Sequence, residues 1–521
     1  MMDLKQHVNH QDLSRGEAPK VLEADVIVVG TGAGGGMVAD ILSQSGLRLI
    51  MLEEGPLKTA QDFKMKEAIA YPDLYQEAMA RRTKDKAISI LQGRSVGGST
   101  TVNWTSSFRT PEQTLSYWQH EFGLTRLTPD SMAPWFERAE KQLNITPWAI
   151  PPNQNNQVLM DGAKALGWKA EIIPRNVKGC ANLGYCGMGC PIGAKQSMLV
   201  TTIPAAMERG AHLYSRTRCE RLIQRAGRIE QVDIRAMDNN GQPTDRVYRL
   251  KANHIILAGG AIGSPAVMLR SELEDPHQRI GRRTFLHPVA ATVADMKQRV
   301  DPYSGAPQSV YSDEFLWRDG VSGKVGYKLE VPPIHPVLGS SIIPFHGLEH
   351  AKIMAGLPHM HASLALMRDG FHHGSVGGQV ELDDYLAPVL DYPVTDYLWE
   401  GVTHAMLTMA ELQFAAGAKR VRPMHMDAPW VNSWSEAQQQ IRALTQKNIR
   451  TLLFSAHVMG GCGMGDKLEN SVVNEQGRFH HLDNLWVMDG SILPTSLGVN
   501  PQLTLYALIS RLATGFAESV K

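Results

Sequence analysis

The segment that most constrains the fold of this chain is residues 24–55, ADVIVVGTGAGGGMVADILSQSGLRLIMLEEG. Residues 25–30 form an apolar run rich in β-branched side chains, which predicts a strand buried on both faces. The next residues have helical periodicity up to a glycine stop at Gly46, and residues 47–52 predict a second strand. A strand, a helix and a second buried strand at this spacing predict a βαβ unit of a parallel sheet, and therefore an α/β fold.

The turn between the first strand and the helix carries Gly30, Gly32 and Gly35 at the spacing G-x-G-x-x-G, and Glu53 closes the second strand. Such glycines let the backbone approach a pyrophosphate at the helix N-terminus, and an acid at this place binds ribose hydroxyls. The segment therefore predicts a dinucleotide site, without separating NAD from FAD. The alternative is an ordinary tight turn, because glycine-rich turns arise for many reasons.

Length and charge set the remaining bounds. At 521 residues the chain is long enough for two domains. Lys+Arg and Asp+Glu are both 52, so no basic surplus indicates a nucleic-acid partner. No apolar run reaches the roughly 20 residues of a membrane-spanning helix. The polar segment 1–20 lacks the apolar core of an export signal, so we expect no integral membrane segment and a cytoplasmic location.

Three further segments have the form of cofactor-binding elements. Residues 93–104, GRSVGGSTTVNW, place a glycine pair before small hydroxyl residues, which suits either a bare turn or a loop lying flat on a cofactor. Residues 252–271 predict a strand, a glycine turn and a helix. Residues 484–515 predict a strand that ends at Asp489 and Gly490, a loop, and a helix with Pro501 near its first turn.

Together with AHVMGGCGMG at 456–465, these motifs resemble, in the same order, those of the glucose–methanol–choline (GMC) oxidoreductases, a family of FAD enzymes. The resemblance implies an FAD cofactor. The residues it implies for cofactor binding are Gly30, Gly32, Gly35, Glu53, Gly97, Gly98, Thr100, Asn103, Asp489, Gly490, Pro501 and Gln502. Because Asn500 stands where other branches carry a second histidine, the active-site pattern is similar to that of cholesterol oxidases and long-chain alcohol oxidases.

By the same resemblance, His457 and Asn500 are the catalytic residues and lie together over the reactive face of the flavin. Alcohol oxidation removes a hydroxyl proton and a hydride, and histidine, with an unperturbed pKa of ~6.5, is suited to act as the base. Asn500 can donate and accept hydrogen bonds, so it can orient the hydroxyl. The alternative is that His457 is a structural loop histidine and Asn500 a turn residue before proline.

The sequence thus predicts an FAD-dependent enzyme that oxidises an alcohol CH–OH group to a carbonyl by hydride transfer to flavin N5. The resemblance favours a lipophilic alcohol, long-chain or sterol-like, with oxygen or a quinone as the electron acceptor. One alternative is a sugar or sugar-acid dehydrogenase that passes electrons through a cysteine-bound iron–sulfur cluster. Another, from a different class, is a flavin-binding protein without turnover.

The cluster alternative depends on Cys180, Cys186 and Cys190, which are spaced C-x5-C-x3-C. Cysteine-rich loops occur both in long-chain alcohol oxidases and in the cluster-bearing dehydrogenases. In the dehydrogenases a further cysteine directly follows the first, and here Ala181 occupies that place. A disulfide or reduced thiols buried as small apolar groups are the favoured alternatives, so no metal site is predicted.

The domain organisation is expected to be discontinuous. Residues 1–110, 190–290 and 450–521 are assigned to a Rossmann-like FAD-binding domain. Residues 111–189 and 291–449 are assigned to an α+β substrate-binding domain and cap, built on a mostly antiparallel sheet. Its predicted strands are 324–331, 361–368 and 378–383, and its predicted helices lie near 394–417 and 434–450.

Overall fold

The predicted βαβ unit is present in the computed structural model, which describes residues 4–520. It consists of β2 (Glu23–Val29), α1 (Ala33–Gln44) and β3 (Leu49–Leu52). The two strands are parallel, with Val26 opposite Leu49. The β-branched residues that predicted the first strand are fully buried at positions 26–28, as a strand covered on both faces requires.

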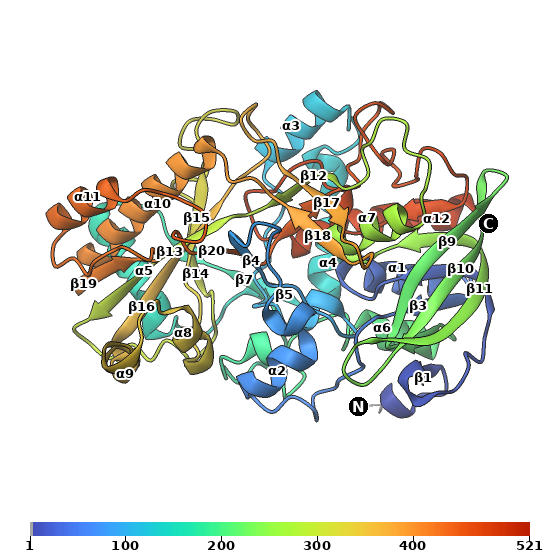
Figure 1. Ribbon diagram of the computed structural model, residues 1–521, viewed down its shortest axis with the longest axis horizontal. Helices are drawn as coiled ribbons and strands as arrows, with labels where there is room; N and C mark the ends of the chain where they lie inside the picture. Colours follow the sequence, from blue (N-terminus) through green and yellow to red (C-terminus); the bar gives the residue numbers. More distant parts are fainter. Residues whose placement is uncertain (1–3, 521) are drawn as a thin grey trace.

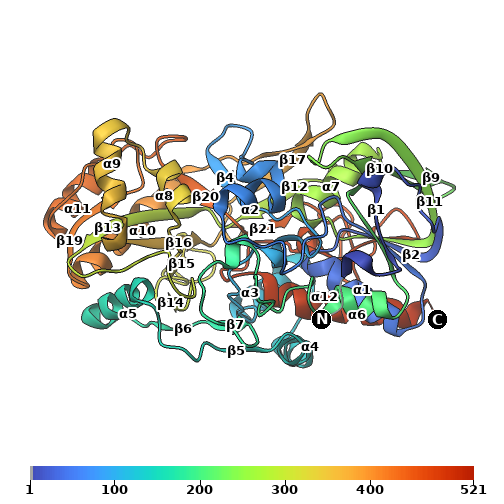
Figure 2. The same cartoon turned by 90° about the horizontal axis from the view of Figure 1, so that it is seen from below.

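The first sheet places the C-terminal motif beside the N-terminal one. Its strand order is β1-β8-β3-β2-β11-β10-β9, and β22 (Leu485–Val487) pairs with β11 (Pro243–Leu257). Both β2 and β22 run parallel to β11. The other strands are β1 (His10–Asp12), β8 (His212–Ser215), β9 (Thr217–Arg225) and β10 (Arg228–Met237). The helix α1 packs against both α12 (Gln502–Ser519) and α6 (Thr202–Glu208), and the three helices lie together on one face of the sheet (Figure 2).

The second large sheet is almost entirely antiparallel, in the order β4-β20-β13-β16-β15-β14-β6, with β19 paired to β13 (Figure 1). Only the pair formed by β4 and β20 is parallel. Its strands are β4 (Ile88–Ile90), β6 (Glu171–Ile172), β13 (Val289–Met296), β14 (Val310–Ser312), β15 (Tyr327–Glu330), β16 (Met360–Met367), β19 (Ala418–Pro423) and β20 (Leu453–Ser455). The helix α10 (Asp396–Ala415) packs against β13 and β16. The predicted fold class, a Rossmann-like domain with a second, mostly antiparallel sheet, is confirmed.

A smaller antiparallel sheet has the order β18-β17-β12-β21. It contains β12 (Arg282–Leu286), β17 (Gly378–Leu382), β18 (Pro388–Asp391) and β21 (Val458–Gly460). The sequence placed the strand at 378–383 with the strands of the substrate domain, but β17 pairs with β12 and β18 instead. The pairing of β12 with β21 sets Leu286 opposite Val458, so the residues that flank this pair also meet.

Helices fill the segment 111–180 only in part. They are α3 (Glu112–Phe122), α4 (Pro129–Gln142) and α5 (Gln154–Leu166). The remaining longer elements are α2 (Glu67–Leu74), α7 (Gly260–Arg270), α8 (Pro336–Ile342), α9 (Gly347–Ala355), α11 (Trp434–Ala443), β5 (Ile145–Pro147) and β7 (Pro174–Asn176). The helix predicted to reach residue 450 ends at Ala443, where the chain becomes extended. The proposed domain boundaries stay a prediction.

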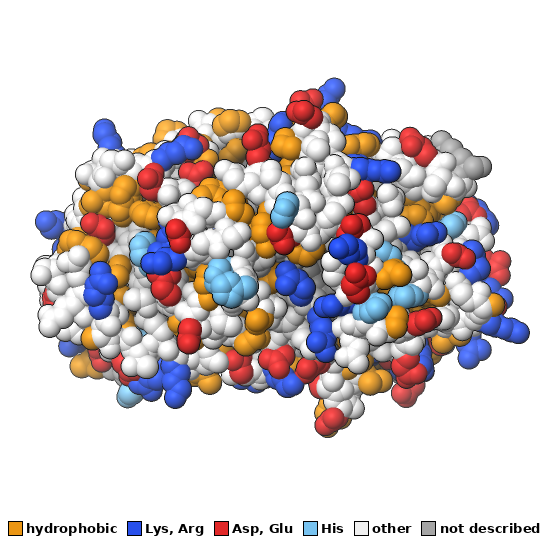
Figure 3. Space-filling view, turned by 90° about the horizontal axis from the view of Figure 1, so that it is seen from above, with side chains coloured by type: hydrophobic (Ala, Val, Ile, Leu, Met, Phe, Trp, Pro, Cys, Tyr) orange, Lys and Arg blue, Asp and Glu red, His pale blue; other side chains and the backbone are white. Residues whose placement is uncertain are grey.

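The surface carries charges of both signs. On the face shown in Figure 3, Lys and Arg side chains alternate with Asp and Glu, without a broad region of one sign. Within residues 4–520, no helix combines the length and the apolar composition needed to cross a bilayer.

Candidate active site

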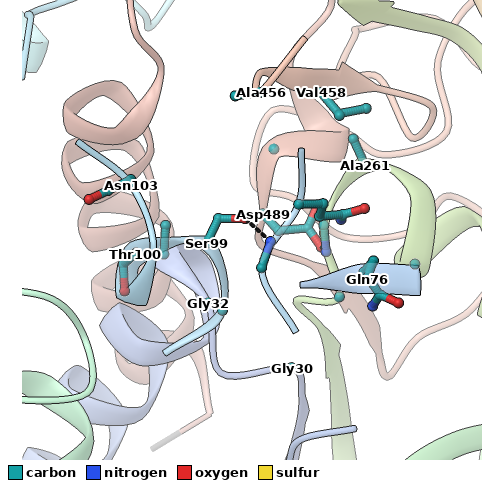
Figure 4. Close-up of a pocket in the computed structure, with 18 of the residues that line it drawn as sticks. Gly30, Gly32, Gln76, Ser99, Thr100, Asn103, Ala261, Ala456, Val458 and Asp489 are labelled. Carbon is teal, nitrogen blue, oxygen red and sulfur yellow. Dashed lines mark hydrogen bonds between the residues drawn. The ribbon is translucent and has the colours of Figure 1, made fainter. Parts of the chain in front are cut away.

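A cavity of about 370 Å³ lies between the loops of the first sheet and one face of the second. Figure 4 shows Ser99, Thr100 and Asn103 on one side of it and Asp489 and Val458 on the other. Of the residues predicted to bind cofactor or substrate, those that line it are Gly30, Gly32, Glu53, Gly98, Thr100, Asn103, His457, Asp489, Gly490, Asn500, Pro501 and Gln502. Gly35 and Gly97 are absent from the lining.

The two glycines outside the lining have packing roles. A Cβ at Gly35 would collide with the carbonyl oxygen of Gly30, so this glycine lets α1 lie close to the end of β2. Gly97 has a φ of +90°, and its N–H donates to Thr31 Oγ1 at 3.1 Å. A Cβ at Gly98 would strike the backbone of Gly32. The two glycine loops therefore touch directly, and only residues without side chains allow this contact.

Glu53 is held at the far end of the same turn. Its Oε2 accepts from Thr31 N at 3.2 Å and Thr31 Oγ1 at 2.5 Å, and its Oε1 accepts from Gly55 N at 2.9 Å. Burial raises the pKa of Glu53, while these donors oppose that rise. Since Oε1 accepts a single hydrogen bond, Glu53 can still accept one from a ribose hydroxyl in the cavity it lines.

Asn103 and Gln502 join the second glycine loop to the start of α12. Asn103 Nδ2 donates to Gln502 Oε1 at 2.6 Å, and Gln502 Nε2 donates to Ser106 O at 2.7 Å. Thr100 Oγ1 donates to Gly97 O at 2.6 Å. The N-terminal residues of α12 line the cavity, so this helix end offers backbone N–H groups and partial positive charge to a bound group.

The carboxylate of Asp489 ties together two elements behind the cavity wall. Its Oδ2 accepts from Gly260 N at 2.8 Å and Ser264 Oγ at 2.5 Å, and its Oδ1 accepts from Ser491 N and Oγ. Asp489 therefore fixes the start of α7 against the loop that begins at Gly490. Together with the glycine cradle, these contacts fit a bound dinucleotide.

His457 meets a second histidine that the sequence analysis did not identify. His287 follows β12, His457 precedes β21, and their Nδ1 atoms lie 3.0 Å apart. His287 is fully buried, whereas His457 lines the cavity. Burial and then the nearby cation of Lys328 lower the pKa of His457 to about 3. Burial, His457 and Lys328 hold the pKa of His287 well below its usual range. Both rings are therefore neutral near pH 7.

Asn500 lies against a buried ion pair. Lys328 Nζ and Glu330 Oε1 are 3.2 Å apart, and neither side chain is exposed. Lys328 Nζ donates to Asn500 Oδ1 at 3.2 Å, and Asn500 Nδ2 donates to Glu330 Oε2 at 3.2 Å. Burial lowers the pKa of Lys328 to about 8, and Glu330 opposes this fall. Because Lys328 can only donate and the Glu330 carboxylate accepts, the pair fixes the positions of the oxygen and the nitrogen in the Asn500 amide. One N–H of Nδ2 and one lone pair of Oδ1 stay available to the cavity.

The part of the cavity formed by the second sheet is apolar. Val289 on β13 and Leu366 on β16 are opposite each other in the sheet, and Leu364 lies on the same face. These residues line the cavity with Phe454 and Trp104, and all five belong to one hydrophobic cluster. The cavity therefore combines a polar glycine-lined part with an apolar wall.

The five cysteines are all free thiols, so the disulfide considered for the segment 180–190 is not formed. Among the described residues, no group of three or more His, Cys, Asp and Glu side chains could hold a metal ion. Cys186 Sγ lies 3.7 Å from the guanidinium of the buried Arg175. Lys195, also buried, donates to Thr101 O, Asn103 O and Cys186 O. The cysteine segment thus braces the loop that carries Asn103.

Sequence reasoning missed His287, Lys328 and Glu330. A signal for the ion pair was present, because Lys328 and Glu330 alternate along the strand GYKLEV and so share one face of a buried strand. Opposite charges on one face of an apolar strand indicate a buried pair. No comparable signal exists for His287, since its partner lies 170 residues away.

Comparisons with known proteins agree with this geometry. Family profiles described as GMC oxidoreductase match residues 71–289 and 374–508. An uncharacterised GMC-type oxidoreductase of Mycobacterium tuberculosis is 32% identical over 500 residues, which cover 94% of this chain and 75% of the relative. A long-chain-alcohol oxidase of Arabidopsis thaliana is 28% identical over 520 residues, which cover 96% of this chain and 68% of the relative.

Solved structures share the fold at lower identity. A pyridoxine 4-oxidase from Mesorbium loti superposes with a TM-score of 0.71 at 16% identity, covering 95% of this chain and 99% of the other. A formate oxidase of Aspergillus oryzae, whose structure was studied for FAD modification, gives 0.71 at 14% identity and covers 96% of this chain and 99% of the other.

Proposed function

The chain belongs to the GMC oxidoreductase family, and on that premise we propose that it oxidises the CH–OH group of a lipophilic alcohol to a carbonyl. Its cofactor is FAD. The glycines of the first turn, Glu53, the loop around Asn103 and the start of α12 are the groups that would hold it. When bound, FAD supplies the hydride acceptor.

One observation carries the proposal. A single cavity is lined by the dinucleotide glycines Gly30 and Gly32, by His457 and Asn500, and by the apolar side chains of the second sheet. A cofactor, two polar groups able to bind a hydroxyl, and an apolar wall for its substituent are the components that oxidation of a lipophilic alcohol requires.

The apolar wall supports the lipophilic substrate class. Val289, Leu364, Leu366 and Phe454 offer no hydrogen-bonding side chains, so they favour an alkyl or ring substituent over a sugar. The similarity to a long-chain-alcohol oxidase supports the same class. A hydroxyl-rich substrate would leave several of its own groups unpaired against this wall.

The two polar residues supply the reacting end of the site. Asn500, held by Lys328 and Glu330, can orient the hydroxyl group. His457 is proposed to contact the alcohol oxygen through Nε2, because its Nδ1 is engaged with His287. The sequence-based hypothesis makes His457 the base that takes the hydroxyl proton.

The first prediction concerns His457→Ala. We expect anaerobic reduction of the bound flavin by the best alcohol of a chain-length series to slow at least ~100-fold, in the range for loss of a group acting at the reacting atoms. Stopped-flow bleaching of the yellow oxidised flavin measures this rate.

His361→Ala is the matched control. His361 is a fully buried histidine that binds Asn155 and Ser363 and is not among the residues that line the cavity. A normal reduction rate in His457→Ala would show that another residue acts at the alcohol oxygen in place of His457. If no alcohol of any length or ring type reduces the wild-type flavin, the chain is instead a flavin-binding protein without this activity.

Reoxidation of the reduced enzyme then identifies the electron acceptor. Oxygen or a quinone is proposed, and mixing the anaerobically reduced enzyme with each of them separates an oxidase from a dehydrogenase. An enzyme that reoxidises with neither would require a protein acceptor.

A further inference from the structure

The hydrogen bonds around His287 fix where its proton lies. The backbone N–H of Gly498 points at His287 Nε2, at a distance of 3.0 Å. A backbone N–H can only donate, so Nε2 of His287 must present its lone pair. In a neutral imidazole the proton is then on Nδ1. Burial keeps this ring neutral, because a charged imidazolium is costly in a fully buried site.

The same reasoning extends to His457. The protonated Nδ1 of His287 lies 3.0 Å from Nδ1 of His457, with the two rings nearly perpendicular at 86°. His287 must donate here, so Nδ1 of His457 accepts. The remaining proton of a neutral His457 is then on Nε2, the nitrogen on the opposite side of the ring from His287.

We propose that His287, oriented by Gly498, is a positioning residue that holds His457 in the Nε2–H form. His457 then offers the substrate a hydrogen-bond donor and no lone pair. This inference rests on the proposed function, because it concerns the contact between His457 and the alcohol oxygen. In the resting enzyme His457 is then a donor that binds and orients the alcohol oxygen, in place of the base of the sequence-based hypothesis.

Two features of the surroundings agree with this assignment of donors and acceptors. Protonation of His457 on Nδ1 would set its N–H against the N–H of His287, and the alternative tautomer of His287 would set its Nε2–H against Gly498 N–H. The cation of Lys328 opposes a positive charge on either ring. Gly498 is also two residues before Asn500. The loop that carries Asn500 therefore also fixes, through His287, the position of the proton on His457.

In this arrangement the hydroxyl proton of the alcohol points away from His457. Asn500 Oδ1 lines the same cavity and accepts a bond from Lys328 Nζ, which leaves it a second lone pair. The alcohol oxygen would accept from His457, and its O–H would donate to the Asn500 amide. The two residues then act as a donor and an acceptor that together orient one hydroxyl group.

Nitrogen-15 NMR of histidine-labelled, FAD-loaded protein tests the inference directly. We expect the His457 resonances of the wild type to show a protonated Nε2 and an unprotonated Nδ1, unchanged between about pH 5 and pH 8, where neutral histidine persists. Comparison with His457→Ala assigns the signals. An unprotonated Nε2 in the resting enzyme would overturn the proposal whatever the activity of the protein.

A variant links the tautomer to the reaction. His287→Leu removes the donor to His457, so we expect the fixed pattern of Nδ1 and Nε2 signals to be lost and flavin reduction to slow by ~10-fold or more, with a smaller change in the alcohol concentration giving half-saturation. His361→Leu removes another buried histidine outside the cavity and should change neither the His457 signals nor the rate.

The outcomes of the two proposals stay separate. If His287→Leu keeps the wild-type His457 pattern, His287 does not set the tautomer. If no alcohol reduces the flavin although the NMR pattern is as expected, the proposed function fails and the tautomer assignment stands.

Discussion

Individual residues behind the cavity wall determine how its two polar groups can act. Neither His457 nor Asn500 stands alone, because His287 binds the first and the pair formed by Lys328 and Glu330 binds the second. All three supporting residues are fully buried. Buried polar groups are stabilising only when all their partners are present, so the supporting residues should be sensitive to substitution.

The buried pair formed by Lys328 and Glu330 should be sensitive to the loss of one partner. Lys328→Met leaves Glu330 as an uncompensated buried charge, so we expect the free energy of unfolding to fall by about 3–5 kcal/mol. In the double variant Lys328→Met/Glu330→Gln, residue 330 is uncharged and its side-chain oxygen can still accept from Asn500. We expect that variant to recover most of the loss, as measured by urea unfolding with excess FAD.

Glu330→Gln alone is the complementary variant, because it leaves Lys328 without its buried counter-charge. Since Glu330 opposes the fall that burial causes in the pKa of Lys328, we expect the lysine to lose its proton more readily in this variant, and its stability to fall as well. A double variant no more stable than Lys328→Met would show that the cost comes from the lost lysine packing, including its contacts with the rings of Phe108 and Tyr311.

At the scale of elements, the contact between α1 and β2 depends on a missing side chain. A Cβ at Gly35 would collide with the carbonyl oxygen of Gly30, and helical backbone cannot move aside without moving α1. We expect Gly35→Ala to separate the helix from the strand and to abolish FAD binding, measured as flavin retained per protein after gel filtration.

Gly515→Ala is the matched control. Gly515 also lies within a helix, α12, but a Cβ there would have no atom within 4 Å. Alanine is the better helix former, so this variant should retain its flavin and gain about 0.5–1 kcal/mol of stability. Full flavin retention in Gly35→Ala would contradict the packing role assigned to that glycine.

The elements also show which parts of the fold were predictable. Periodicity and glycine spacing predicted β2, α1, β3, α10 and α12, since each is a local pattern. The small sheet was not predictable, because β12, β17 and β21 pair across large sequence separations. That sheet brings His287 to His457, so the sequence placed the histidine that lines the cavity but not its partner.

For the whole molecule, buried neutral histidines make stability depend on pH. Burial lowers the pKa of His361 and of His457 to about 3, and in the unfolded chain each has its ordinary value near 6.5. Between these values the unfolded chain binds protons that the folded protein does not. Stability from this source is therefore complete above about pH 6.5 and is lost as the pH falls toward 3.

The last prediction isolates one of these histidines. In His361→Leu the unfolded chain no longer binds a proton at residue 361. Below pH 6.5 its free energy of unfolding should therefore fall less steeply with falling pH than that of the wild type, and the two slopes should differ by about 1 kcal/mol per pH unit. Urea unfolding at pH 7, 6 and 5 compares the two slopes. Equal slopes would show that His361 is already protonated in the folded protein at pH 5.

One wall of the cofactor cradle comes from the βαβ unit at residues 23–52 and another from α12, and β22 joins the sheet through β11. A ribosome that has made residues 1–260 therefore presents Gly30 and Glu53 without the wall that runs from Asp489 to Gln502. FAD therefore cannot contact the complete cradle until residues 489–502 have been synthesised. A nascent chain released before residue 484 would leave its flavin cleft open to water.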